Sequence, residues 1–109
     1  PAEVVADPES EVFRVARALC ARTREVAEAS GARFRLVVLP GRDDLRAAKG
    51  EYWAAFVESL RSDGVEVIDL TAALRAVGVP DDDAAWMPGG HYSPATNALV
   101  ARELALRLR

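Results

Sequence analysis

The sequence contains little cysteine, histidine or lysine, with one residue of each among 109. The single cysteine, Cys20, excludes a disulfide within the chain. Because Cys20 falls on the apolar stripe of a predicted helix, we expect it to be a buried structural thiol. The single histidine, His91, is the one side chain whose ordinary pKa lies near neutral pH, so its position needs a physical explanation.

Long apolar runs and basic blocks are also missing. No run approaches the roughly 20 residues that a membrane-spanning helix needs, and no signal peptide is visible. The sequence begins without Met, so we expect a processed or trimmed start, and both a cytoplasmic and a secreted location stay open. The net charge of −3 and the scattered arginines argue against nucleic acid as the partner. Abundant alanine and arginine are typical of a GC-rich bacterial genome.

The composition is that of a globular protein, with half of the residues hydrophobic and 28% charged. A chain of 109 residues suits one compact domain or part of a larger one. Apolar residues at spacings of three and four predict a first helix that begins at Asp7-Pro8 and ends before Gly31. Its expected buried stripe consists of Val12, Phe13, Ala16, Leu19, Cys20, Thr23, Val26 and Ala27.

Two strands and a second helix are expected next. Four consecutive aliphatic residues, from Leu36 to Leu39, predict a strand that is covered on both faces. A helix should follow from Asp43 or Asp44 to Gly64. Its buried stripe would consist of Leu45, Ala48, Tyr52, Phe56 and Leu60. The segment "VEVIDL" (65–70) predicts the second strand.

The remaining sequence predicts two helices around an acidic loop. Thr71 is expected to cap a short helix that runs through Val77 and ends at Gly78. Ser93 and Pro94 mark the start of the last helix. Its inward-facing residues would be Leu99, Val100, Leu104 and Leu108.

The predicted order of elements is α, β, α, β, α, loop, α. A right-handed crossover through a helix makes the two strands parallel neighbours. A two-stranded parallel sheet cannot cover both of its faces and both of its edges. We therefore expect either self-association or a larger α/β domain in which these are the last two strands.

His91 lies on the connection that leaves the carboxyl end of the second predicted strand. Ligands and catalytic groups gather at this end in open α/β sheets. Ser93 and Pro94 hold His91 just outside the last helix, and Gly89 and Gly90 allow backbone conformations that other residues avoid. A histidine there can act as general base toward a hydroxyl from another strand end. The alternative is a loop histidine that hydrogen-bonds a nearby carbonyl.

Two other groups of residues could contribute to a site. Trp86 and Met87 could line an acyl pocket or simply anchor the loop to the core. Arg42, Asp43 and Asp44 follow the first strand, where the acids should cap a helix or, alternatively, form a wall of a substrate cleft. The run "PDDD" favours a solvated loop over a cation site, because calcium loops space their ligands at alternate positions.

The block "GGHYSPATNALVA" (89–101) resembles the C-terminal block of the SGNH (GDSL-type) hydrolase family. In that family a catalytic Asp-x-x-His precedes Ser-Pro or Asn-Pro, a small residue, Gly-Asn or Gly-His, and an apolar helix. The matching residues are His91, Ser93, Pro94, Asn97, Val100 and Ala101. "FRLVVLPGRDDL", a helix and "GVEVIDLTAAL" precede the block in the family's order, so the resemblance covers roughly residues 30 to 109.

The resemblance implies a three-layer α/β/α, flavodoxin-like fold. Residues 1–109 would be the C-terminal portion of a single SGNH-type hydrolase domain, supplying two parallel strands and the flanking helices. The chain would contain the catalytic base but not the family's Gly-Asp-Ser nucleophile block. The Gly and Asn that complete the oxyanion hole are also missing, so nucleophile and oxyanion hole would lie outside this chain.

The residue three positions before His91 is Pro88, where the family has the acid that orients the histidine ring. A loop carbonyl or an acid of "PDDD" could replace it, and Asp83 is the nearest of these acids. Thr96 also stands where the family usually has Gly, which matters less on a helix.

The implied activity is that of a serine esterase or deacetylase with His91 as general base and without a cofactor or metal ion. The substrate would be an acyl ester or an O-acetylated carbohydrate, and the protein partner either the missing N-terminal half of the domain or a second copy. Two alternatives stay open, a catalytically inactive SGNH-like interaction domain and a polysaccharide O-acetyltransferase-type relative. A flavodoxin-like regulatory domain is disfavoured because neither strand ends in the paired acids that it needs.

Overall fold

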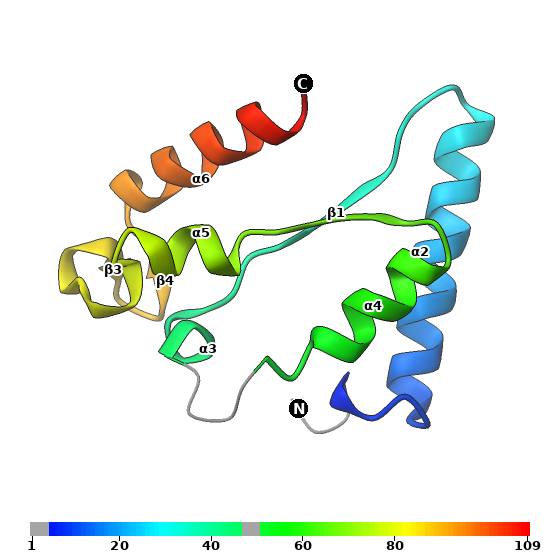
Figure 1. The fold of residues 1–109 in the computed structure, drawn as a ribbon, viewed down its shortest axis with the longest axis horizontal. Helices are drawn as coiled ribbons and strands as arrows, with labels where there is room; N and C mark the ends of the chain where they lie inside the picture. Colours follow the sequence, from blue (N-terminus) through cyan, green and yellow to red (C-terminus); the bar gives the residue numbers. More distant parts are fainter. Residues whose placement is uncertain (1–4, 47–50) are drawn as a thin grey trace. The chain divides into compact units, whose positions relative to one another are not determined.

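The computed structural model describes residues 5–46 and 51–109 and shows a small α/β protein with a two-stranded parallel sheet (Figure 1). No helix within these residues is both long and apolar enough to cross a membrane. The elements are α2 (Glu11–Ala29), β1 (Arg35–Val38), α3 (Arg42–Arg46), α4 (Ala54–Ser62), β2 (Glu66–Asp69), α5 (Thr71–Ala76), the 3₁₀ turns η1 (Val79–Asp81) and η2 (Asp83–Ala85), β3 (Trp86–Met87), β4 (His91–Tyr92) and α6 (Pro94–Arg107).

The first predicted helix is present as α2, but it begins later than expected. Its N-cap is Ser10, whose hydroxyl accepts a hydrogen bond from the Phe13 N–H at 3.1 Å. The start predicted at Asp7 is wrong because Asp7 forms a separate turn, in which its carboxylate accepts from the Glu9 N–H. The predicted end is confirmed, since Gly31 has a φ of 79° just after the helix.

The predicted buried stripe of α2 is largely wrong. Phe13 is the one fully buried residue of the helix, whereas Val12, Leu19 and Val26 are each more than half exposed. Cys20 is only partly buried, and that burial raises the pKa of its thiol. The apolar side of the helix is therefore wider than the surface that covers it.

The helix predicted from Asp43 to Gly64 is also wrong, because α3 and α4 are separate and Glu51–Trp53 are not helical. Ala48, one of the expected stripe residues, lies outside the described residues. The non-helical stretch directly follows Gly50, and a glycine in a helix interior costs about 1 kcal/mol relative to alanine. The apolar spacing alone did not reveal this interruption.

The parallel pairing of β1 and β2 is confirmed. The ladder extends past the end of β2, where the Leu70 N–H donates to the Val38 carbonyl at 3.3 Å. The residues of β1 are only half-buried, so the expectation that both faces of this strand are covered is wrong. The three-layer arrangement implied by the family resemblance remains a prediction.

The short helix α5 is capped by a different residue than expected. Asp69, not Thr71, supplies the capping carboxylate, which accepts from the Thr71 N–H at 2.9 Å and from the Thr71 hydroxyl at 2.5 Å. Gly78 ends the segment with a φ of 76°, as predicted.

The chain divides into two compact units. Among the described residues, unit 1 covers 5–36 and 51–67, and unit 2 covers 37–46 and 68–109. In unit 1, α2 and α4 pack through an edge-to-face pair of Phe13 and Phe56, with ring centroids 5.3 Å apart. The Arg17 guanidinium forms a two-pronged ion pair with the Asp63 carboxylate at 2.6 and 2.7 Å.

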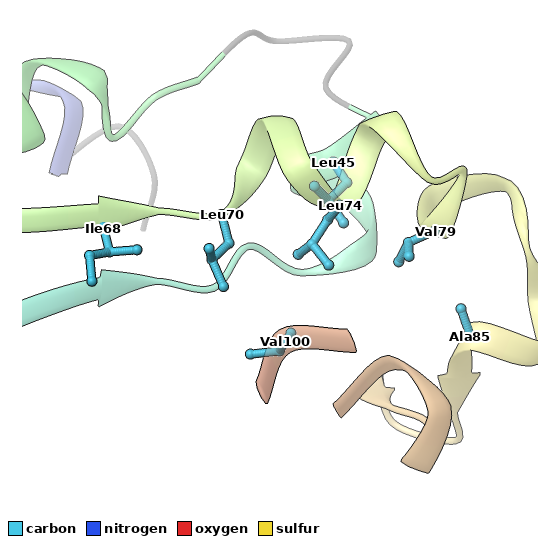
Figure 2. Packing of buried hydrophobic residues seen from close by; sticks show 7 residues of the cluster. All are labelled: Leu45, Ile68, Leu70, Leu74, Val79, Ala85 and Val100. Atoms are coloured by element: carbon cyan, nitrogen blue, oxygen red, sulfur yellow. The ribbon is translucent and has the colours of Figure 1, made fainter. Parts of the chain in front are cut away.

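Unit 2 contains the larger hydrophobic cluster. Figure 2 shows side chains from α3, β2, α5, the loop after α5 and α6 gathered around one interior: Leu45, Ile68, Leu70, Leu74, Val79, Ala85 and Val100. The helix α6 begins as predicted, with Ser93 at its N-cap and Pro94 at its first position. Of its predicted inward-facing residues Val100 is buried, Leu99 and Leu104 are partly buried, and Leu108 is exposed.

Leu74→Ala should lower the free energy of unfolding by about 2–5 kcal/mol, because Leu74 is 1% exposed and its loss leaves a cavity in unit 2. Leu106→Ala is the matched control, since Leu106 is 57% exposed and should change stability by about 0.5 kcal/mol or less. Urea unfolding monitored by circular dichroism measures both. Equal losses in the two variants would contradict this core assignment.

Candidate active site

His91 belongs to a small hairpin that the sequence analysis did not predict. In this hairpin β3 and β4 pair antiparallel, with Trp86 opposite Tyr92 and Met87 opposite His91. The Gly90 N–H closes the turn on the Met87 carbonyl at 3.2 Å. Gly89 and Gly90 have φ values of 83° and 80°, a region that favours glycine. The turn therefore requires the two glycines that precede His91.

The residue after the hairpin ties it to the start of α6. Ser93 is buried, its hydroxyl accepts from the Thr96 N–H at 3.2 Å, and its own N–H donates to the Ala85 carbonyl at 2.9 Å. The Thr96 hydroxyl donates to the same carbonyl at 2.8 Å. Ser93 is thus a helix cap in a closed hydrogen-bond network, as the sequence predicts.

The imidazole of His91 is exposed, and no residue of the described chain hydrogen-bonds it. The alternative of a loop histidine held by a nearby carbonyl therefore finds no support within these residues. No serine of the described chain is bonded to the ring either.

Tyr92 fixes the hairpin to the segment that follows β1. Its hydroxyl donates to the Pro40 carbonyl at 2.6 Å. Burial, with a smaller contribution from the Asp44 carboxylate, raises the pKa of this hydroxyl, so it stays protonated and able to donate. The Tyr92 ring also packs against Trp86, with centroids 5.2 Å apart. His91 is therefore one residue away from an anchored position at the carboxyl end of β1.

Arg42 fixes the acidic loop in the same unit. Its Nε donates to the Pro80 carbonyl at 3.0 Å, and its Nη2 donates to the Asp83 carboxylate at 2.6 Å. The guanidinium also lies over the Trp86 ring, 6.0 Å from the centroid. Trp86 completes the set by donating its indole N–H to the Val79 carbonyl at 2.9 Å.

Asp83, the predicted substitute acid, is thus paired with Arg42 and not with His91. The hydrogen bond from Arg42 and then its charge lower the pKa of the Asp83 carboxyl. The carboxylate is charged and highly exposed, and its described side-chain partner is Arg42. Its role as the acid remains a prediction.

An open pocket of about 540 Å³ lies beside the hairpin. One side comes from the residues directly after β1, and the other comes from β3 and the hairpin turn. The lining residues are Gly41, Arg42, Asp43, Asp44, Trp86, Met87 and Gly90. The pocket therefore sits at the carboxyl end of a parallel strand, where α/β proteins place their ligands.

The structure resolves two alternatives that the sequence left open. Trp86 anchors the loop through its indole N–H, and with Met87 it lines the pocket, while the acyl character of that pocket stays a prediction. Asp44 both lines the pocket and caps, because its carboxylate accepts from the Gly41 N–H at 3.0 Å. Tyr92 and the clamping role of Arg42 were missed, since a hydrogen bond between distant segments leaves no periodic signal in the sequence.

Two aspartates of the acidic run make hydrogen bonds within the protein. The Asp82 carboxylate accepts from the Ala84 N–H at 3.0 Å, and Asp83 pairs with Arg42. Within residues 5–46 and 51–109, no three histidine, cysteine, aspartate or glutamate side chains are grouped so that they could hold a metal ion.

The fold and the site define a small α/β protein with an exposed histidine on a hairpin and an open pocket, lined in part by that hairpin, at a strand end. Comparison with models of known protein families, with curated proteins and with solved structures finds no match to this chain.

Arg42→Gln should return the pKa of Asp83 toward the ordinary aspartate value of about 3.9, because Arg42 is the first cause of its lowering. The folded state favours the charged carboxylate. The ion pair therefore stabilises the loop fully above the ordinary aspartate pKa of about 3.9. Its contribution disappears as the pH falls through the lowered pKa of Asp83 in the folded protein. Carboxyl ¹³C NMR titration measures the shift, with Arg102→Gln as control. An unchanged Asp83 titration in Arg42→Gln would refute the ion pair.

Gly89→Ala and Gly90→Ala should destabilise the protein by a similar 1–2 kcal/mol, about the cost of a left-handed conformation in a residue other than glycine. The variants should differ at His91. A Cβ at position 89 would lie 3.4 Å from the imidazole Cδ2 and 3.5 Å from Nε2, whereas one at position 90 has nothing within 4 Å. Imidazole NMR resonances should shift more in Gly89→Ala. Equal shifts in both variants would contradict this placement of the ring.

Proposed function

We propose that this chain is the C-terminal part of an SGNH-type serine hydrolase of three-layer α/β/α, flavodoxin-like fold, with His91 as the general base. The observation that carries the proposal is the placement of His91. Its imidazole is exposed and makes no hydrogen bond within the described chain, and the preceding residue, Gly90, lines a pocket at the carboxyl end of β1. The family resemblance of residues 89–101 supports the same assignment.

The proposed reaction is acyl transfer through a serine that lies outside this chain. His91 takes the proton from the serine hydroxyl as its oxygen bonds to the acyl carbon, and then gives that proton to the leaving alcohol. The acyl-serine is next cleaved by water, whose proton passes to His91 and from there to the serine oxygen as the C–O bond breaks and the acid leaves. If a sugar hydroxyl replaces the water, the same steps give O-acetyl transfer.

The second ring nitrogen of His91 needs a hydrogen-bond acceptor to hold the ring in the productive tautomer. Pro88 cannot supply one from its side chain, and Asp83 is engaged by Arg42. The engaged state of Asp83 favours a second candidate function, an SGNH-like interaction domain without catalysis. The two functions differ in whether the complete protein depends on His91 for turnover.

In the complete protein, His91→Ala should reduce esterase turnover at least ~1,000-fold, because loss of a triad member typically costs several orders of magnitude. Short acyl esters serve as substrates, and circular dichroism confirms that the variant is folded. A folded His91→Ala protein that keeps most of its activity would refute the general base, and an inactive parent protein would favour the interaction domain.

Asp83→Asn in the same protein tests the orienting group, with Asp81→Asn as a matched control from the same loop. If Asp83 orients the ring, its substitution should cost nearly as much as His91→Ala. If a backbone carbonyl has this role, both aspartate variants should keep most of the activity. Steady-state kinetics on the folded variants measures the difference.

The 109-residue chain alone should show no ester hydrolysis above background, because it contains neither the nucleophile block nor the residues of the oxyanion hole. A pH-stat assay with a short acyl ester measures this, with the complete protein as positive control. Turnover by the isolated chain that disappears in His91→Ala would show that the nucleophile lies within it.

A further inference from the structure

The pocket lined by the hairpin and by the start of α3 combines an apolar side with a strongly polar one. Met87 is 48% exposed and, with Trp86, supplies the apolar side. Arg42, Asp43 and Asp44 supply the polar side. Such a combination suits a ligand that carries hydrogen-bonding groups and apolar C–H surface on the same small ring.

The hydrogen bonds already made within the pocket show which groups remain for a ligand. Arg42 uses Nε and Nη2 within the protein, and Asp44 uses one carboxylate oxygen for the Gly41 N–H. The exposed Asp43 carboxylate makes no hydrogen bond within the described chain. The free groups are therefore mainly acceptors, which call for a ligand rich in hydroxyl donors.

The net charge of the pocket lining disfavours an anionic ligand. The guanidinium of Arg42 is neutralised by Asp83, which leaves Asp43 and Asp44 as the net charges of the lining. A phosphate or a uronic acid would be repelled by these two carboxylates. A long acyl chain is also disfavoured, because it would remove the carboxylates from water without offering them a hydrogen bond.

We propose that this pocket binds a neutral sugar, whose hydroxyls donate to Asp43 and Asp44 and whose C–H face lies against Met87 and Trp86. Its volume of about 540 Å³ lies within the range of small-molecule sites. The assignment of the pocket as a substrate subsite rests on the proposed function. The substrate would then be an O-acylated neutral saccharide. As a sugar-binding site, the pocket can be measured in this chain without any activity.

The test is an NMR titration of the ¹⁵N-labelled 109-residue chain with cellotetraose, xylotetraose and mannotetraose as neutral probes. At least one of them should shift the amide resonances of Arg42, Met87 and Gly90. Tetragalacturonate and hexyl acetate, the anionic and the aliphatic probes, should bind at least tenfold more weakly. The proposal is overturned if no neutral sugar shifts these amides up to its solubility limit, or if hexyl acetate binds more tightly.

Asp43→Ala should weaken the binding of the neutral sugar about tenfold, because a hydrogen bond to a charged group is typically worth one such factor or more. Asp81→Ala is the matched control, an exposed aspartate of the same unit outside the pocket lining. Equal affinity in Asp43→Ala and in the unmodified chain would refute the assignment of this carboxylate.

The two proposals fail in different ways. Sugar binding together with an active His91→Ala protein would refute the general base and leave the pocket standing. Activity that depends on His91 in a protein whose pocket binds no neutral sugar would refute the pocket assignment alone.

Discussion

The arrangement of the candidate site depends on one side chain, the guanidinium of Arg42. Its planar fork reaches the Pro80 carbonyl and the Asp83 carboxylate at once, and it lies over the Trp86 ring. Pro80 and Asp83 belong to the connection between α5 and the hairpin, and Trp86 begins the hairpin, whereas Arg42 is the first residue of α3, shortly after β1. Because guanidinium donors have a rigid geometry, this contact fixes the loop against the strand end more strictly than a lysine could.

The same interaction has a chemical consequence for His91. A charged Asp83 bound to Arg42 is a poor candidate for a second hydrogen bond to an imidazole, because breaking the pair exposes an unpaired guanidinium over Trp86. In the proposed hydrolase, a neighbouring carboxylate would therefore not simply replace the acid that the family pattern has at the position of Pro88. A backbone carbonyl has no ion pair to break, so in the proposed hydrolase it would orient the ring at a lower energetic cost than Asp83.

Local signals in the sequence predicted the ends of the elements better than their packing. Gly31, Gly78 and the Ser93-Pro94 pair marked boundaries correctly, because each acts through its own backbone conformation or a hydrogen bond a few residues away. The interruption between α3 and α4 could not be found in this way. Leu45 and Leu60 fit one helical stripe, but they belong to the cores of different units, and only long-range packing decides that.

The apolar stripe of α2 also shows that a local sequence pattern does not predict long-range packing. Amphipathic spacing predicts that a helix has an apolar face, but not how much surface is present to cover it. In unit 1, α4 covers the side that carries Phe13, which leaves Val12, Val15, Leu19 and Val26 half exposed or more. Further strands and helices packed against α2, as in the proposed larger hydrolase domain, would bury this exposed apolar face. The proposal would then explain a feature of unit 1 that has no connection with His91.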